Sequence, residues 1–238
     1  MRVVILCGGK GTRAYPYSDY FPKPMMPIGG TPILIHIMRL YAQQGFTHFV
    51  LAAGYRIEIL HDYFEGRFSD WTVEIVDTGL ESDTGERIRR CAPYLDGPFF
   101  ATYGDGVGVI HLHDLLAFHK AKGGIGTVTT VPLPSQYGTV ISDSEGLVSA
   151  FREQPVLREH WINAGFFVFE PEVFDADVWQ GQNLERDVLP KLVEQKALFS
   201  YQHEGFWKSL DTSRDQQILE RLFQEGGASW TIDLAEPR

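Results

Sequence analysis

Cysteine is scarce in this sequence of 238 residues, which holds only Cys7 and Cys91. Two cysteines cannot form the disulfide framework that stabilises small secreted domains. No group near Cys7 in the sequence would serve as a general base, so we interpret it as a small apolar residue at a strand end. Stability must then come from a hydrophobic core, and a chain that is 44% hydrophobic is long enough to bury one.

Long apolar runs and a signal-peptide pattern are also missing. The apolar stretches are far shorter than the roughly 20 residues that cross a bilayer, and the N-terminus lacks the charged and apolar regions of a leader. We therefore expect a cytoplasmic protein. No linker, repeat or low-complexity tract interrupts the chain, which predicts a single domain over residues 1–238.

Positive charge is in deficit, because the formal net charge is −10 and the pI is near 5.2. This balance argues against binding to nucleic acid or to an anionic membrane. The first 25 residues are the exception, since Asp19 is their only acidic residue. Their basic residues are Arg2, Lys10, Arg13 and Lys23. Anionic substrates would then be held by a local basic pocket and by metal.

A glycine-rich loop follows the first apolar run. Val3 to Cys7 predicts a buried parallel strand, and Gly8, Gly9 and Gly11 come directly after it. Successive backbone N–H groups in such a loop can bind phosphate oxygens. We interpret the segment as an extended loop that wraps a nucleoside triphosphate and points Arg13 and Lys23 at its phosphates; an ordinary connection between elements is the alternative.

Two better-known phosphate loops fit poorly. A Walker A loop requires Lys-Ser or Lys-Thr followed by a helix, and neither is present. Residues 9–14 match the dinucleotide pattern G-x-G-x-x-A, but the prolines that follow exclude a long helix. The acidic residue that would bind the ribose is also missing, because no Asp or Glu occurs from Tyr20 to Ile57. An acyl-transfer site lacks its G-x-S-x-G sequence.

Strands and helices alternate through the first half of the chain, which predicts βαβ units and a mainly parallel sheet. In the second half, strands separated by turn residues predict antiparallel pairs. The fold class is thus α/β, a mixed but mainly parallel sheet flanked by helices. The expected strands are 3–7, 46–53, 71–76, 98–102, 126–132, 137–141, 147–152 and 161–169, and the expected helices are 32–44, 57–64, 111–120, 184–195 and 213–224.

Two distant aspartates are candidate magnesium ligands. Asp105 follows a buried strand between two glycines, and Asp211 lies more than a hundred residues later. Magnesium is often held by one or two carboxylates together with substrate phosphates. The alternatives are a turn aspartate for Asp105 and a helix N-cap for Asp211. A zinc site at His111, His113 and His119 is disfavoured, because no fourth ligand is near in the sequence.

Several motifs in order resemble the sugar-1-phosphate nucleotidylyltransferases, and among them the cytidylyltransferases that act on glucose 1-phosphate. The resemblance covers nearly the whole chain. The motifs are Gly8-Gly9-x-Gly11-Thr12-Arg13, Lys23-Pro24-Met25, Pro27-Ile28-Gly29-Gly30, Val76-Asp77-Thr78-Gly79, Thr102-Tyr103-Gly104-Asp105-Gly106, Trp161-Ile162-Asn163-x-Gly165, and Glu204-Gly205-Phe206-Trp207 with Asp211-Thr212.

This resemblance implies a nucleotide-diphospho-sugar transferase fold, Rossmann-like, with a nucleotide-binding N-terminal half and an acceptor-binding C-terminal half. It implies transfer of a nucleoside monophosphate, CMP from CTP, to a sugar 1-phosphate in a homo-oligomer. Arg13 and Lys23 would be catalytic, and Asp105 and Asp211 would hold Mg²⁺. The nucleotide would be bound by Leu6, Cys7, Gly8, Gly9, Lys10, Gly11, Thr12, Arg13, Lys23, Thr84, Gly85, Arg87 and Gly104, and the acceptor by Gly138, Glu153, Gln154 and Asn163.

Three positions depart from the family pattern. Gln154 replaces the lysine of Glu-Lys-Pro, Gln136 replaces an arginine, and Glu86 replaces a glycine. Each change lowers the positive charge or adds negative charge near the expected acceptor, and a lost charge-assisted hydrogen bond weakens anion binding. Two alternatives therefore stay open: a cytidylyltransferase for another sugar phosphate or a small non-sugar phosphate or phosphonate, and a nucleotide-binding regulatory protein without turnover.

Overall fold

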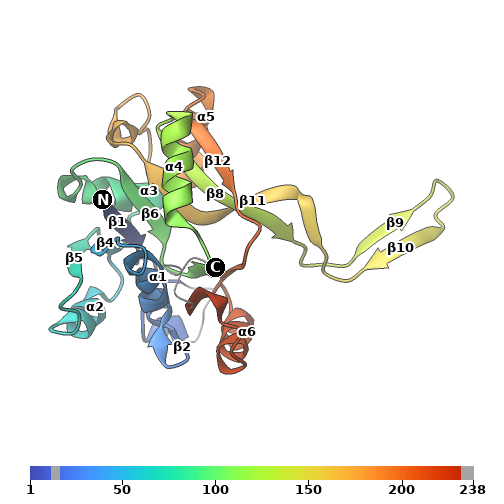
Figure 1. Ribbon diagram of the computed structural model, residues 1–238, viewed down its shortest axis with the longest axis horizontal. Helices are drawn as coiled ribbons and strands as arrows, with labels where there is room; N and C mark the ends of the chain where they lie inside the picture. Colours follow the sequence, from blue (N-terminus) through green and yellow to red (C-terminus); the bar gives the residue numbers. More distant parts are fainter. Residues whose placement is uncertain (12–16, 232–238) are drawn as a thin grey trace.

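A twisted sheet runs through the molecule, with helices against both of its faces (Figure 1). The computed structural model describes residues 1–11 and 17–231, and in this part of the chain the sheet has seven strands in the order β12-β8-β11-β6-β1-β4-β5. All run parallel except β11, which is antiparallel to both neighbours. The strands are β1 (Arg2–Leu6), β4 (His48–Ala53), β5 (Thr72–Asp77), β6 (Phe99–Tyr103), β8 (Gly126–Pro134), β11 (Val156–Phe169) and β12 (Leu198–Gln202). The predicted mixed, mainly parallel sheet is confirmed.

Strand β1 shows why both faces of the sheet are covered. Its side chains alternate between the two faces, as in any strand: Val3 and Ile5 belong to one core cluster and Val4 to the other. Helices α1, α2, α4 and α6 contribute to the first cluster, α3 and α5 to the second. The helices are α1 (Ile33–Ala42), α2 (Ile57–Phe64), α3 (Thr84–Cys91), α4 (Leu112–Lys122), α5 (Leu189–Glu194) and α6 (Ser213–Gln224). Because β1 is buried on both sides, it reads as a continuous apolar run in the sequence.

Most predicted elements are present, and two of the helices, 57–64 and 213–224, have the predicted bounds. The sequence did not predict α3 or β12. Helix α3 is missed because its sequence is mostly polar and charged, with Ile88 and Cys91 as its buried apolar residues. The helix expected over 184–195 is a π-helical turn, η6 (Leu184–Val188), that continues into α5.

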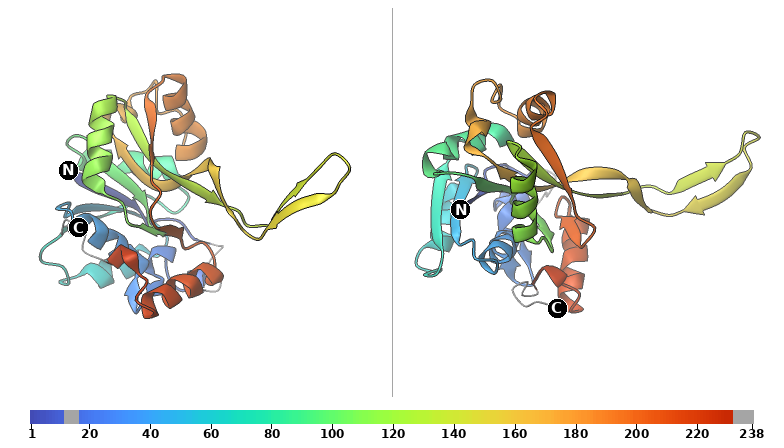
Figure 2. Two further views of the ribbon diagram at one scale, coloured as in Figure 1. Left: turned by 45° about the vertical axis from the view of Figure 1, so that its right-hand side comes forward. Right: turned by 45° about the horizontal axis from the view of Figure 1, so that its top comes forward.

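The strands expected over 137–141 and 147–152 do not join the central sheet. They form β9 (Thr139–Ser142) and β10 (Val148–Arg152), which pair antiparallel with each other as a separate two-stranded unit. Figures 1 and 2 show this hairpin projecting far from the body at the ends of β8 and β11. We call residues 135–155 the arm. Its tip is a turn in which Asp143 Oδ1 accepts hydrogen bonds from two backbone N–H groups.

Two shorter antiparallel pairs lie outside the central sheet. β2 (Pro27–Ile28) pairs with β3 (Thr31–Pro32), and β7 (Gly106–Gly108) pairs with β13 (Trp207–Ser209). The second pair matters for the site, because it brings the segment before α6 next to the end of β6. Among the helices of the described ranges, none combines the length and the apolar character that a membrane span needs.

Candidate active site

The glycine-rich loop lies at the carboxyl edge of the sheet, where the parallel strands β1, β4 and β6 end side by side. Backbone hydrogen bonds fix its start: Cys7 N–H donates to Ala52 O over 3.0 Å, and Tyr55 N–H donates to Gly8 O over 3.0 Å. Gly9 is exposed, and no described atom lies within 4 Å of the place where its Cβ would be. A ligand can therefore approach this backbone closely, and the carboxyl edge of an open α/β sheet is the usual ligand-binding edge.

A cavity of about 430 Å³ opens beside this loop. The nucleotide-binding residues predicted from the sequence that line it are Leu6, Cys7, Gly8, Gly9, Gly11, Lys23, Thr84, Arg87 and Gly104. Asp105 also lines it, together with Pro24, Ser82, Asp83 and Tyr103, which were not predicted as site residues. Burial raises the pKa of the Cys7 thiol above its ordinary value. The thiol thus stays protonated, consistent with an apolar rather than a nucleophilic role.

Two predicted nucleotide-binding residues lie beside the cavity without lining it. Lys10 is exposed, and its ammonium is 3.6 Å from a carboxylate oxygen of Glu81. Gly85 is buried against residues 182–184, where a Cβ would lie 2.8 Å from Gln182 O. The glycine at this position therefore allows close packing of the cavity wall.

Lys23, Asp105 and Asp211 converge at one end of the cavity. Lys23 Nζ donates to Asp105 Oδ2 over 2.6 Å and to Asp211 Oδ1 over 3.0 Å. The lysine is buried, with 6% of its surface exposed. The two carboxylates thus point at one position, which the ammonium group of Lys23 occupies. A pair of converging carboxylates is also the donor set that suits magnesium.

Local structure explains how residues so far apart in the sequence meet. In the pairing of β7 with β13, Ser209 lies opposite Gly106, and Leu210 N–H donates to Asp105 O over 2.7 Å. This hydrogen bond brings the segment that carries Asp211 beside Asp105. The N-cap of α6 is Thr212, in a capping box with Asp215. Asp211 is therefore not the N-cap, so the helix-capping alternative is wrong.

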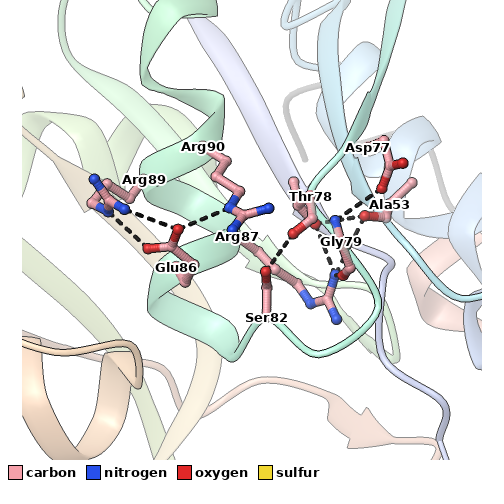
Figure 3. A network of polar contacts seen from close by, with 9 residues as sticks. All are labelled: Ala53, Asp77, Thr78, Gly79, Ser82, Glu86, Arg87, Arg89 and Arg90. Atoms are coloured by element: carbon pink, nitrogen blue, oxygen red, sulfur yellow. Dashed lines mark hydrogen bonds and ion pairs between the residues drawn. The ribbon is translucent and has the colours of Figure 1, made fainter.

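Arg87 holds the wall of the cavity together. Its Nη1 donates to Thr78 Oγ1 over 2.8 Å and to Gly79 O over 2.8 Å (Figure 3). Its Nη2 donates to Leu80 O over 3.1 Å. The guanidinium also occupies the space where a Cβ of Gly8 would lie. Burial lowers the pKa of Arg87. Arg87 thus connects helix α3 to the end of β5 and lies directly behind the glycine-rich loop.

Glu86 adds no unpaired negative charge to the cavity, contrary to the expectation from its replacement of a glycine. Its two carboxylate oxygens accept from Arg89 Nε at 2.7 Å and from Arg90 Nε at 2.8 Å (Figure 3). These hydrogen bonds from the arginines lower the pKa of Glu86 below its ordinary value. The charge is compensated within α3.

A second polar network joins residues of α3, β6 and η6 at the cavity. Glu185, in η6, accepts hydrogen bonds from the hydroxyls of Thr84 and Tyr103. Asn163 Nδ2 donates to Tyr103 Oη over 3.0 Å, so the predicted acceptor residue Asn163 reaches a residue that lines the cavity. Glu185 was not predicted from the sequence, because no motif or spacing marks it. Its only local signal is Asn183, a residue typical of helix N-caps, two positions earlier.

The other predicted acceptor residues lie elsewhere. Gly138, Glu153 and Gln154 belong to the arm and are absent from the described lining of the cavity. A Cβ on Gly138 would lie 3.0 Å from Glu153 Oε2, and Gln154 Nε2 donates to Gln136 O over 3.3 Å. The arm thus holds Gly138 beside Glu153 and Gln154 beside Gln136, and none of them is in the described lining of the cavity.

The other residues considered from the sequence are Thr12, Arg13 and the histidines of the zinc alternative. Thr12 and Arg13 fall outside the described residues. The residues described include no group of three or more His, Cys, Asp or Glu able to hold a metal, so the zinc alternative gains no support there. His119 instead lies 2.8 Å from Thr127 Oγ1 and 3.1 Å from Glu170 Oε1, and His113 lies 2.9 Å from Gln44 O.

Comparison with known sequences agrees with this geometry. The family model described as "Nucleotidyl transferase" matches residues 2–219. The chain is 37% identical to the glucose-1-phosphate cytidylyltransferase of Salmonella typhi, covering 97% of this chain and 98% of the relative. It is 34% identical to the probable glucose-1-phosphate cytidylyltransferase of Bacillus subtilis, covering 98% of this chain and all of the relative (100%).

Solved structures share the fold at lower sequence identity. HddC from Yersinia pseudotuberculosis complexed with GMP-PN superposes with a TM-score of 0.73 at 21% identity, covering 93% of this chain and 99% of that one. A UDP-glucose pyrophosphorylase complexed with UDP-glucose gives the same TM-score of 0.73 at 16% identity, covering 94% and 98%. At such identities the likeness concerns the fold alone.

Proposed function

The chain belongs to the nucleotidyl transferase family, and on that premise we propose that it transfers the CMP unit of CTP to a sugar 1-phosphate such as glucose 1-phosphate, with release of pyrophosphate. The observation that carries the proposal is the meeting of Lys23, Asp105 and Asp211 beside the glycine-rich loop. We infer the identity of the base, cytosine, and of the acceptor, glucose 1-phosphate, from the cytidylyltransferases that match this chain along nearly its whole length.

The proposed reaction needs alignment and charge compensation more than proton transfer. A phosphate oxygen of the acceptor forms a bond to the α-phosphorus of CTP while the bond from that phosphorus to the bridging oxygen of pyrophosphate breaks in line. The acceptor phosphate is already ionised at neutral pH, so it requires no general base. Positive charge from Arg13 and Lys23 would stabilise the α-phosphate and the departing pyrophosphate. A loss of less than tenfold in turnover for Arg13→Ala would contradict this role.

We propose Mg²⁺ as the cofactor, with Asp105 and Asp211 as its protein ligands. Their oxygens lie 2.6 and 3.0 Å from the same ammonium nitrogen, which supports a shared cation position. When bound, magnesium would neutralise phosphate charge and polarise phosphate oxygens. Lys23 would then be released from the carboxylates and become available to phosphate oxygens.

The residues at the expected acceptor positions favour a second candidate function. Gln154 offers an amide where the family has a lysine, and Gln136, whose carbonyl it contacts, stands where an arginine is usual. These neutral amides bind a dianionic phosphate more weakly than cations do. Transfer of CMP to another sugar phosphate, or to a small phosphate or phosphonate, is therefore the alternative. The third candidate, a regulatory nucleotide-binding protein, is disfavoured by the intact set of Lys23, Asp105 and Asp211.

We also propose that the protein acts as a homo-oligomer through the arm. Large apolar side chains are exposed along it, which is unusual for a surface that faces only water. They are Tyr137 (78% exposed), Val140 (54%), Ile141 (55%), Leu147 (71%), Val148 (54%) and Phe151 (65%). Covering by a second copy would remove this apolar area from water. Sedimentation of wild type and of Ile141→Lys tests the idea: the variant should lose oligomer, and an unchanged mass would contradict the proposal.

The two thiols are buried and free, as expected for the reducing cytoplasm in which we place the reaction.

Pyrophosphate release measured with each of the four nucleoside triphosphates, against glucose 1-phosphate and a panel of phosphates and phosphonates, tests the proposed reaction. Release with CTP and glucose 1-phosphate supports the main proposal. Release only with another acceptor supports the alternative and makes Gln154 and Gln136 the specificity residues. CTP binding without any release would support the regulatory protein.

A further inference from the structure

Glu185 connects two walls of the cavity that belong to different parts of the fold. Its Oε2 accepts from Thr84 Oγ1 over 2.8 Å, at the first turn of α3. Its Oε1 accepts from the hydroxyl of Tyr103, the last residue of β6. Both hydroxyl-bearing residues line the cavity, whereas Glu185 lies behind them in η6. Single π-helical turns such as η6 often occur at functional sites.

The carboxylate fixes the direction of every hydrogen bond in this network. An ionised carboxylate only accepts, so both hydroxyls must donate to it. Tyr103 Oη is then left to accept from Asn163 Nδ2 over 3.0 Å, and Thr84 Oγ1 accepts from Leu184 N–H over 3.0 Å. Burial, followed by the nearby charge of Glu185, raises the pKa of Tyr103, so its hydroxyl keeps the proton that it donates.

The orientation of Asn163 follows from the same chain of bonds. With Nδ2 committed to Tyr103, its Oδ1 accepts from Gly165 N–H over 2.7 Å. The ring of Tyr103 packs against Gly165, where a Cβ would overlap it, and against Phe167 at a centroid distance of 5.7 Å. The side-chain amide of Asn163 is thus held from both ends, by Gly165 N–H at Oδ1 and at Nδ2 by Tyr103 Oη, whose own proton is donated to Glu185.

Among the described residues, Glu185 forms no ion pair with a basic side chain. Its carboxylate accepts hydrogen bonds from the two neutral hydroxyls of Thr84 and Tyr103. What it does provide is a fixed geometry for Thr84 on one side and for Tyr103 and Asn163 on the other. These are the sides where the nucleotide and the acceptor are expected.

We propose that Glu185 is a positioning residue that sets the nucleotide-binding and the acceptor-binding walls of the cavity together, through Thr84 and through the Tyr103–Asn163 pair. The proposal rests on the proposed function, because it assigns the two walls to the two substrates. It predicts three separable effects. Loss of the hydrogen bond from Thr84 to Glu185 weakens nucleotide binding, and loss of the hydrogen bond from Tyr103 to Glu185 weakens acceptor binding. Loss of the Glu185 carboxylate weakens both.

Calorimetry with two probes separates these effects. CMP contacts only the nucleotide wall, and CDP-glucose, or the CDP derivative of whichever acceptor supports turnover, contacts both. For Thr84→Val we expect both Kd values to rise about tenfold, the usual order for a lost hydrogen bond to a charged group. For Tyr103→Phe only the Kd of the CDP derivative should rise. For Glu185→Gln the Kd of CMP should rise as in Thr84→Val, and that of the CDP derivative should rise further.

Matched variants exclude a purely structural role. Thr84→Ser keeps the hydroxyl and should retain CMP affinity. Glu194→Gln changes an exposed carboxylate on the adjoining helix α5, which pairs with Lys191 at 2.8 Å, and should change neither Kd. In the double variant Tyr103→Phe/Glu185→Gln the effects on the CDP derivative should not add, because one acts through the other. Each variant's thermal unfolding is recorded alongside.

The outcomes are distinct. Weakening of CMP binding by Tyr103→Phe to the same extent as binding of the CDP derivative would overturn the positioning role, and so would Kd changes in all variants that follow only their loss of thermal stability. Unchanged Kd values for Glu185→Gln would overturn it as well. Failure of the proposed function shows itself differently, as the lack of pyrophosphate release by the wild-type protein with every substrate pair, while the binding pattern of CMP and the CDP derivative still tests Glu185. A wild type that binds neither probe contradicts both.

Discussion

The ammonium of Lys23 lies 2.6 Å from Asp105 Oδ2, although 82 residues separate the two in the sequence. Lys23 is buried after the glycine-rich loop, and Asp105 follows the end of β6. A buried cation is costly unless it is paired, and here two carboxylates pair it. The same arrangement gathers the positive and negative groups that a metal-bound triphosphate would need.

Removal of the cation should leave two carboxylates facing each other. We expect Lys23→Met to lower the free energy of unfolding by about 2 kcal/mol in the absence of divalent ions, since it removes the buried ammonium that pairs with both carboxylates. Magnesium should raise the melting temperature of this variant more than that of wild type, because the ammonium would no longer occupy the position between Asp105 and Asp211. Thermal melts with and without magnesium check this expectation. Lys191→Met, which removes an exposed ion pair with Glu194, is the control and should change little.

Each aspartate should be needed for binding of the magnesium nucleotide. Asp105→Asn and Asp211→Asn keep the side-chain shape but remove one charge from the shared cation position. We expect each to raise the Kd of MgCTP at least tenfold, while the Kd of CTP in EDTA changes less. The double variant should lose little more than either single variant, because the two residues act as a unit. Isothermal calorimetry gives these constants, and unchanged MgCTP binding in both single variants would refute the metal assignment.

Neighbouring glycines in the loop should respond differently to the same substitution. A Cβ at Gly8 would overlap the Arg87 guanidinium and lie 2.9 Å from the backbone of Ala53, so Gly8→Ala should cost about 2 kcal/mol of stability. A Cβ at Gly9 would meet no described atom within 4 Å. Gly9→Ala should therefore fold normally yet bind CTP more weakly, because the methyl group occupies the space that the phosphates approach. Chemical denaturation and CTP titration of the two variants separate these effects, and equal stability losses would contradict them.

The pairing of Glu86 with two arginines should make part of the stability depend on pH. The hydrogen bonds from Arg89 and Arg90 lower the pKa of Glu86 below its ordinary value of 4.5. A depressed carboxylate pKa contributes stability that is fully present above the unfolded value and is lost as pH falls through the folded one. Glu86→Gln should thus be less stable than wild type by about 1 kcal/mol at pH 7, and the difference should shrink below pH 4.5. Denaturant unfolding across this range measures it, and a difference independent of pH would contradict the account.

Much of the fold could be predicted from regular patterns in the sequence. The apolar run ending at Cys7 and the alternation of strands and helices predict the parallel sheet, because burial on both faces requires such runs. Helix α3 was not predicted because its pattern lacks an apolar stripe. Arg87, Arg89 and Arg90 form hydrogen bonds and ion pairs with polar groups. The arm was not predicted as a separate hairpin, because the alternation of apolar and polar residues predicts strands but not the strands with which they pair.

The site was predictable where motifs mark it and not where contacts between distant elements create it. Resemblance and charge pointed to Lys23, Asp105 and Asp211, and these residues do meet. Glu185 could not be found in this way, because its role depends on the packing of η6 against α3 and β6. Gly138, Glu153 and Gln154 are the converse case, since they stand at the acceptor positions of the family pattern yet lie on the arm. Sequence order alone does not tell which cavity they serve.

Phosphorus NMR of CTP incubated with glucose 1-phosphate and magnesium tests the central claim most directly, because it follows the α-phosphorus itself. We predict that the CTP signals are replaced by those of pyrophosphate and of a nucleoside diphosphate sugar, only when the acceptor is present, and not in Asp105→Asn. Loss of CTP at the same rate without acceptor, giving CMP, would mean hydrolysis and would contradict the transfer of a nucleotidyl group.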